Sequence, residues 1–321
     1  PGCFAGCTSL TGTLTLPSTL KKLGVQECYV PIYDGVFAGC NFVCEIILPD
    51  GLEVLGSGTF CGCPNIYGEI RLPDGLKAIG AGAFQGCENL TGSIVIPQGV
   101  TTIPYDTFNG TWVGGTLTLH DGIISIGTGA FANTGLKGEL RLPKNLEVIS
   151  HSAFYNCDFS GNLVLPENLY TIGNDAFAYN WRLMGTLEIP ENVISIGANA
   201  FAACRSLEGI IFPEGLESIN KGAFYECFGI GRIVCKGTVP AYVIEGAFDG
   251  IPKDNFTLEV PESAIHQYQS AVGWKDFKRI SAYRNLVIRP SMATAINTTV
   301  TRDLVLTADD EWYVESQPDW V

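Results

Sequence analysis

The sequence predicts a mainly β solenoid of about eleven coils, because two residue types recur along it in fixed columns. One column is a phenylalanine that recurs every 23 or 24 residues from Phe37 to Phe248. The other is a proline that lies 11 residues before its phenylalanine from Pro49 to Pro213, with His120 in place of one proline. A fixed period of this length is typical of solenoids, in which no single unit can bury its own apolar face.

The order of residues within one unit predicts which side chains point inward. In "LRLP", residues 140 to 143, the apolar residues alternate as in a strand with one buried face, and the proline ends strand pairing. Equivalent strands of successive coils run in one direction, so they stack as a parallel sheet at roughly 4.8 Å. After each strand a Leu-x-x-Ile-Gly segment, as at Ile79-Gly80, adds two inward residues and a turn. An Ala-Phe pair then fills the middle of the coil.

The resulting consensus, L-x-[LI]-P-x-x-[LV]-x-x-I-G-x-x-A-F-x-x-C, resembles the leucine-rich repeats of the BspA-like (Treponema pallidum type) family of bacterial surface proteins. The resemblance covers about residues 1 to 250. It implies a right-handed solenoid with parallel strands on the concave face and short irregular or 3₁₀ segments opposite. It also implies adhesion or other protein and glycan contacts on the extracellular or outer-membrane surface of a Gram-negative, Bacteroides-type anaerobe. No secretion signal opens this sequence, so any export signal would lie outside it.

The repeat pattern stops before the end of the chain. Pro261 predicts the start of a short amphipathic helix, along which Ile265, Tyr268 and Val272 recur at helical spacing. We therefore expect three parts: a leucine-rich repeat solenoid over residues 1–256, a cap with a short helix over residues 257–283, and a short β segment over residues 284–321.

Both parts after the solenoid resemble segments of Bacteroides surface proteins. The cap resembles the segment that follows such repeats, and this predicts that Trp274 and Phe277 plug the core instead of forming a ligand platform. The stretch "EWYVESQPDWV" resembles the W-x-V-x-x-x-P-x-W core of a BACON-type, immunoglobulin-like module. It would be a partial copy because the sequence ends at Val321, and the resemblance implies a suggested association with carbohydrate.

Charge and hydropathy exclude two classes of partner. The formal net charge is -14, from 33 acidic and 19 basic residues, which disfavours nucleic acid and anionic lipid. No run of 18 or more apolar residues occurs, so we expect no insertion into a membrane.

The cysteines follow the repeat. A residue type that recurs in one solenoid column packs against its own copies, so we expect a ladder of reduced, buried thiols. A disulfide between neighbours such as Cys40 and Cys63 is an alternative. A zinc site around Cys61 and Cys63 is disfavoured because C-x-C is not a usual ligand spacing, and we expect no metal or cofactor. The column contains Cys7, Cys40, Cys63, Cys87, Cys157, Cys204 and Cys227.

Two further features are candidates for binding. Between Pro17 and Phe37 lie 20 residues, nine more than the standard 11, and Tyr29 and Tyr33 in this excursion form a candidate loop site. The alternative is a drifted loop without a partner. An acidic residue follows the column proline in six of nine coils, and it either attracts cations and basic partners or caps the next turn.

We expect no enzyme. His120, His151 and His266 stand in different contexts, and no nucleophile motif accompanies them. The best candidate for binding is the outward side of the strands, where apolar residues flanked by charged ones are typical of a protein interface. The candidate partner-binding residues there are Ile47, Glu69, Arg71, Val95, Thr118, Glu139, Arg141, Val164 and Glu188.

These observations predict a non-enzymatic cell-surface binding or adhesion protein that contacts a protein partner. A carbohydrate-binding module is the first alternative, with Tyr155, Tyr179, Trp181, Tyr225 and Phe228 as a possible platform away from the strands. A structural spacer is the second alternative.

Overall fold

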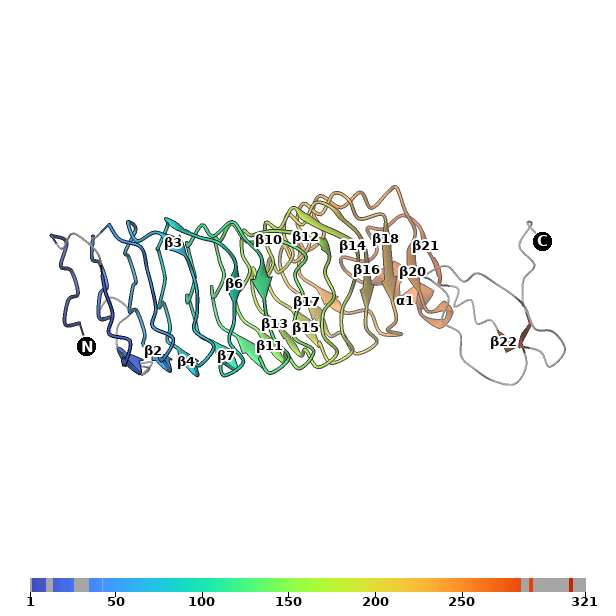
Figure 1. Cartoon of the computed structure of the whole chain (residues 1–321). Coiled ribbons are helices and arrows are strands. Elements are labelled where there is room, and N and C mark those ends of the chain that lie inside the picture. Colours follow the sequence, from blue (N-terminus) through green and yellow to red (C-terminus); the bar gives the residue numbers. More distant parts are fainter. Residues whose placement is uncertain are drawn as a thin grey trace. The chain divides into compact units, whose positions relative to one another are not determined.

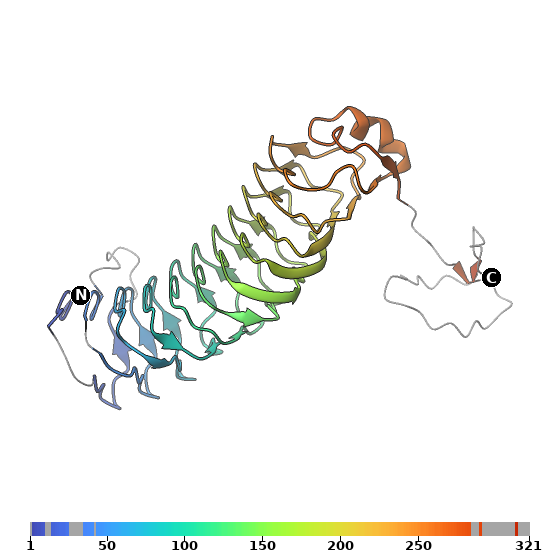
Figure 2. The same ribbon diagram turned by 90° about the horizontal axis from the view of Figure 1, so that it is seen from above.

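The computed structural model describes residues 2–9, 14–25, 35–41 and 43–283, together with the backbone at 289–290 and 312–313. The chain divides into two compact units, Pro1–Ser281 and Ala282–Val321. The first unit is a parallel β-solenoid whose coils lie side by side in sequence order, as the predicted fold class requires (Figures 1 and 2).

A strand precedes the column position in most coils and pairs in parallel with its copy in the next coil. Before Pro17 no strand is described, and directly before Pro49 and Pro143 the pairing is reduced to isolated bridges at Glu45 and Arg141. We call this stack the first ladder. Its strands lengthen toward the C-terminal coils, where β14, β16 and β18 form a continuous sheet. The strands are β3 (Gly68–Glu69), β5 (Leu90–Thr91), β6 (Ile94–Val95), β8 (Leu117–Thr118), β10 (Lys137–Gly138), β12 (Asp158–Asn162), β14 (Arg182–Glu188), β16 (Leu207–Phe212), β18 (Arg232–Cys235), β20 (Leu258–Val260) and β21 (Ile280–Ala282).

A second ladder of two-residue parallel strands runs along another edge of the coils, the lower edge in Figure 1. The sequence did not predict it as a sheet. It coincides with the Leu-x-x-Ile-Gly segment, where a Cβ on Gly80 would overlap the backbone of Ser57 in the preceding coil. Glycine is required there by close backbone approach. The strands are β1 (Lys22–Leu23), β2 (Val54–Leu55), β4 (Ala78–Ile79), β7 (Thr102–Ile103), β9 (Ser125–Ile126), β11 (Val148–Ile149), β13 (Thr171–Ile172), β15 (Ser195–Ile196), β17 (Ser218–Ile219) and β19 (Tyr242–Val243).

The column phenylalanines form one continuous stack through the core. Within the described residues, eleven rings from Phe4 to Phe248 follow one another with centroid separations of 5.3 to 5.9 Å and interplanar angles of 6 to 16°. At these separations parallel rings are offset, which is a favourable arrangement for aromatic quadrupoles. The stack fixes the register of every coil against the next.

The cysteine column lies beside this stack, and the eleven cysteines among the described residues are free thiols. A ladder thiol donates to the carbonyl of the phenylalanine in the preceding coil, as Cys63 does to Phe37 at 3.0 Å and Cys157 does to Phe131 at 3.1 Å. Burial raises the pKa of both thiols to about 12. The predicted ladder of reduced, buried groups is therefore confirmed from Cys40 to Cys227, and the structure adds a hydrogen bond that ties each thiol to its neighbouring coil.

The cap closes the last coil with η2 (Glu262–Ala264) and α1 (Ile265–Ser270). Tyr268 and Trp274 are buried, and the Trp274 Nε1–H donates to the carbonyl of Ala241 at 2.8 Å. Phe277 is also buried, so the prediction that Trp274 and Phe277 plug the core is confirmed. The prediction for Val272 was wrong: α1 ends at Ser270, and Val272 is exposed.

In the second unit, the described part is an antiparallel pair of two-residue strands, β22 (Arg289–Pro290) and β23 (Trp312–Tyr313). The rest of the BACON-like segment lies outside the described residues. The candidate loop residues Tyr29 and Tyr33 lie outside them as well.

Candidate binding face on the first ladder

The outward side chains of the first ladder form two parallel columns, which we call the strand face. They lie two and four residues before the column proline, since alternate residues of a strand point to opposite sides. Val95 pairs with Thr118, Arg141 with Val164, and these pairs bring equivalent residues of neighbouring coils together. The two columns contain Ile47, Arg71, Val95, Thr118, Arg141, Val164 and Glu188, and Glu45, Glu69, Ser93, Thr116, Glu139, Asn162 and Thr186.

Three β-branched residues on the strand face expose more than half of their surface to solvent and do not contribute to the core. The exposed fraction is 66% for Ile47, 55% for Val95 and 73% for Val164. Charged or hydroxyl residues separate them along the column. The strand face therefore alternates apolar and polar groups at the spacing of the coils.

The arginines of the strand face pair with glutamates two residues earlier in the chain. Arg71 Nη2 lies 2.8 Å from Glu69 Oε2, and Arg141 Nη2 lies 3.0 Å from Glu139 Oε2. Both pairs are largely exposed, so each adds little to the stability of the fold. Their chief effect is to fix the guanidinium groups beside Val95 and Val164.

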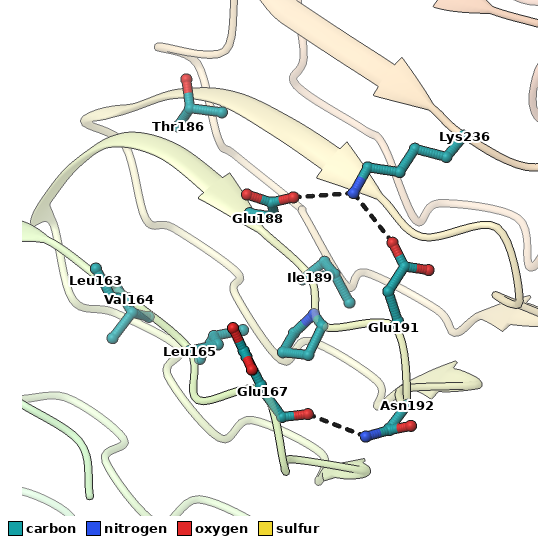
Figure 3. Close-up of a pocket in the computed structure, with 11 residues that line it drawn as sticks. Leu163, Val164, Leu165, Glu167, Thr186, Glu188, Ile189, Glu191, Asn192 and Lys236 are labelled. Atoms are coloured by element: carbon teal, nitrogen blue, oxygen red, sulfur yellow. Dashed lines mark hydrogen bonds and ion pairs between the residues drawn. The ribbon is translucent and has the colours of Figure 1, made fainter. Parts of the chain in front are cut away.

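The first of three shallow hollows on the strand face has a volume of about 600 Å³ and lies beside Val164. Figure 3 shows Lys236 reaching from two coils away to Glu188 and Glu191, with Nζ at 2.9 and 3.0 Å from their carboxylates. Partial burial opposes the charge on Lys236, but the two carboxylates outweigh it and raise the pKa of this amine. A charged bridge therefore borders one side of the hollow and Val164 borders the other.

Two further hollows lie at the N-terminal end of the strand face, with volumes of about 610 and 460 Å³. Glu69 and Arg71 line both of them; Ile47 lines one and Val95 the other.

The structure thus divides the nine predicted residues into groups. Ile47, Glu69, Arg71 and Val95 come together at one end, and Val164 and Glu188 come together at the first hollow. Thr118, Glu139 and Arg141 lie between these groups on the strand face and line none of the three hollows.

Sequence reasoning missed Lys236. Phe212 pairs with Cys235, so in the strand register this lysine takes the place of Pro213, although it lies 12 residues before Phe248. The missing proline was a usable signal, since a polar residue in a packing column needs a partner.

The acidic column after the proline caps turns at the two positions where a direct contact is present. The backbone N–H of Lys144 donates to Asp121 at 3.1 Å, and that of Glu214 donates to Glu191 at 3.3 Å. The first bond and the Lys144 side chain hold the pKa of Asp121 below its usual value. Turn capping fits these two residues, and each carboxylate also pairs with a lysine, Asp121 with Lys144 and Glu191 with Lys236.

Two histidines also fill structural positions. His120 Nε2 lies 3.0 Å from the carbonyls of Pro97 and Val100, and His151 Nδ1 accepts the backbone N–H of Asn174 at 2.8 Å. Among the described residues, no three His, Cys, Asp or Glu side chains are placed to hold a metal ion. No helix in this part of the chain is long and apolar enough to span a membrane.

A parallel solenoid with the strand face open along its coils has the architecture of leucine-rich repeats. Residues 124–253 match the family described as BspA type leucine rich repeat region, in six copies, so the resemblance seen in the consensus is confirmed there.

A search of curated proteins found no match. Among solved structures, a leucine-rich repeat protein from Bacteroides ovatus is 24% identical, covers 88% of this chain and 74% of its own, and superposes with a TM-score of 0.59. This likeness shows the fold.

Two other solved structures match at lower TM-scores. The pneumococcal vaccine antigen PcpA is 17% identical, covers 85% of this chain and 79% of its own, and has a TM-score of 0.42. A leucine rich cell surface protein from Faecalibacterium prausnitzii is 18% identical, covers 82% of this chain and 87% of its own, and has a TM-score of 0.31.

Proposed function

We propose that the chain is a non-enzymatic binding or adhesion module, displayed on a bacterial cell surface, that binds a protein partner through the strand face. The observation that carries the proposal is that exposed Ile47, Val95 and Val164 lie in one column, separated by charged or hydroxyl side chains. The match of residues 124–253 to the BspA-type repeat supports the proposed display at the surface.

The composition of the strand face favours a protein over a sugar. Its two columns hold aliphatic, hydroxyl and charged residues and no aromatic ring. Apolar contacts at the centre of an interface with charged groups at its rim are typical of protein recognition. The ion pairs of Arg71 and Arg141 hold these groups in place before binding, which lowers the entropy lost on association.

The test is a binding screen of the whole chain on an array of host extracellular and serum proteins, followed by affinity measurement on the hits. The variant Val95→Ala/Val164→Ala removes exposed methyl groups only. We expect it to weaken binding about tenfold for each buried valine.

The matched control is Val272→Ala, which shortens an exposed valine in the cap. Loss of affinity in the strand-face variant with an unchanged control supports the proposal. Equal affinity of the wild type and the strand-face variant for every hit would remove the strand face as the binding surface.

A further inference from the structure

A second exposed cluster lies away from the strand face, on the turns that follow the column phenylalanines. We call it the aromatic corner. Trp181, Tyr179, Tyr225 and Phe228 are all exposed there, and Trp181 and Phe228 occupy the same position, four residues after their column phenylalanine. The aromatic corner consists of Tyr155, Tyr179, Trp181, Arg205, Tyr225 and Phe228.

Backbone strain marks the same coils. The position two residues after the column phenylalanine has a left-handed backbone, and glycine occupies it in the first five coils, as at Gly62 (φ 65°) and Gly86 (φ 69°). From the sixth to the tenth coil residues other than glycine occupy it: Asn133 (φ 53°), Asn156 (φ 53°), Tyr179 (φ 64°), Ala203 (φ 57°) and Glu226 (φ 57°). Side chains other than glycine are disfavoured in this conformation, and such outliers cluster at functional sites. The side chains of Tyr179 and Glu226 are thus retained against the local backbone preference.

Contacts within the corner fix several of its side chains in advance. The rings of Tyr155 and Tyr179 meet edge to face at 5.4 Å. Arg205 lies over the Phe228 ring at 5.6 Å and pairs with Glu226 at 2.6 Å. Rigid aromatic side chains bind with little loss of entropy, so this arrangement suits recognition.

Between the coils of Tyr179 and Tyr225 the intervening coil carries Ala202 and Ala203, whose side chains end at Cβ. Both alanines are buried, so no large side chain of this coil projects between Tyr179 and Tyr225. Around the two alanines are ring faces, tyrosine hydroxyls and a guanidinium group. Ring faces pack on the C–H faces of sugars, and the polar groups can hydrogen-bond sugar hydroxyls.

The spacing and the charge narrow the class of sugar. Trp181 and Phe228 are two coils apart, or about 10 Å, with Arg205 in the coil between them. One unit of an extended β-1,4-linked chain advances by roughly one coil, and alternate units present the same face. Glu226 neutralises Arg205, and the carboxylates of Asp175 and Asp249 act electrostatically on Tyr155 and Tyr225, so an anionic sugar is disfavoured.

We propose that the aromatic corner is a binding site for a neutral, extended β-1,4-linked oligosaccharide. Alternate sugar units pack on Trp181 and on the part of Phe228 that Arg205 does not cover, and the unit between them hydrogen-bonds to Arg205. This site is independent of the strand face and of its protein partner.

The test is isothermal titration of the whole chain with cellohexaose and xylohexaose, and with maltohexaose as the α-linked control. We expect binding of at least one β-linked hexasaccharide, with Trp181→Ala and Phe228→Ala each weakening it about tenfold or more. Trp112→Ala is the matched control, since Trp112 occupies the same repeat position in an earlier coil and is 64% exposed, against 54% for Trp181. This control should bind as the wild type does.

Tyr179→Gly separates binding from folding, because glycine adopts the left-handed backbone without strain. We expect this variant to lose affinity while its Tm stays the same or rises. Absence of binding to both β-linked probes at millimolar concentration would overturn the proposal. So would preference for maltohexaose, or equal binding by the Trp181→Ala variant and the wild type. Strand-face variants should leave this titration unchanged, so the failure of one site does not imply the failure of the other.

Discussion

The buried thiol column predicts a specific loss of stability at high pH. Burial raises the pKa of Cys157 and of Cys227 to about 12, from an ordinary value of 9.0. In the unfolded chain these thiols ionise near pH 9, whereas in the folded protein they stay neutral. Above pH 9 the unfolded state therefore binds fewer protons than the folded state, and the free energy of unfolding falls as pH rises toward 12.

The size of the effect follows from the shift. Each thiol contributes about 1.4 kcal/mol per pH unit between its two pKa values, so at pH 10.5 each costs on the order of 2 kcal/mol. Cys157 and Cys227 together should cost about 4 kcal/mol relative to pH 8.

The perturbation that isolates this effect is Cys157→Thr/Cys227→Thr. Threonine is suited to the column because Thr111 and Thr134 already occupy it, buried, and donate to phenylalanine carbonyls at 2.9 Å. Its hydroxyl does not ionise in this range, and the tyrosines and lysines are the same in both proteins.

The assay is urea unfolding followed by circular dichroism at pH 8 and pH 10.5, with a reductant present. We expect the wild type to lose about 4 kcal/mol more than the threonine variant between the two pH values. Equal losses in the two proteins would show that the thiols do not stay neutral in the fold, and the proposed origin of the effect would be wrong.

Three further predictions concern the core. Phe131→Ala, in the middle of the phenylalanine stack, should lower the free energy of unfolding by about 3 to 5 kcal/mol. Phe4→Ala, at a ring that is 46% exposed, should lower it by less than about 1 kcal/mol. Urea unfolding measures both changes, and similar losses in the two variants would contradict the stack model. Trp274→Ala should destabilise the cap, so amide hydrogen-exchange rates should rise in the last coils before they rise in the middle ones. A uniform rise along the solenoid would contradict a capping role for Trp274. Iodoacetamide at pH 8 should modify the exposed Cys3 and leave Cys204 intact, because burial raises the pKa of Cys204 well above its usual value. Peptide mass spectrometry identifies the modified cysteines, and modification of Cys204 in the folded protein would contradict the prediction.

The inward residues could be predicted from the sequence because a repeat tests each column many times. Phe131 and Cys157 are buried as the repeat required, and Trp274 is buried as the resemblance of the cap implied. The second ladder was missed because its strands are two residues long, and so short a segment carries no alternation.

Contacts between exposed side chains could not be predicted in the same way. Lys236 spans two coils to reach Glu188, and its conformation depends on surface partners that periodicity does not constrain. The prediction that Val272 lies on the helix was wrong because apolar residues continue at helical spacing beyond Ser270, where α1 ends.

The uninterrupted phenylalanine stack has a consequence for how such a protein can change in length. Each ring meets nearly the same environment above and below, so removal or duplication of one whole repeat would rejoin the stack without a mismatch. Such a change would move the N-terminal group around Ile47 and Arg71 nearer to or farther from Val164 by one coil, roughly 4.8 Å. Insertion or deletion of whole repeats would therefore change the distance between groups on the strand face in steps of one coil, while the packing of the core stays the same.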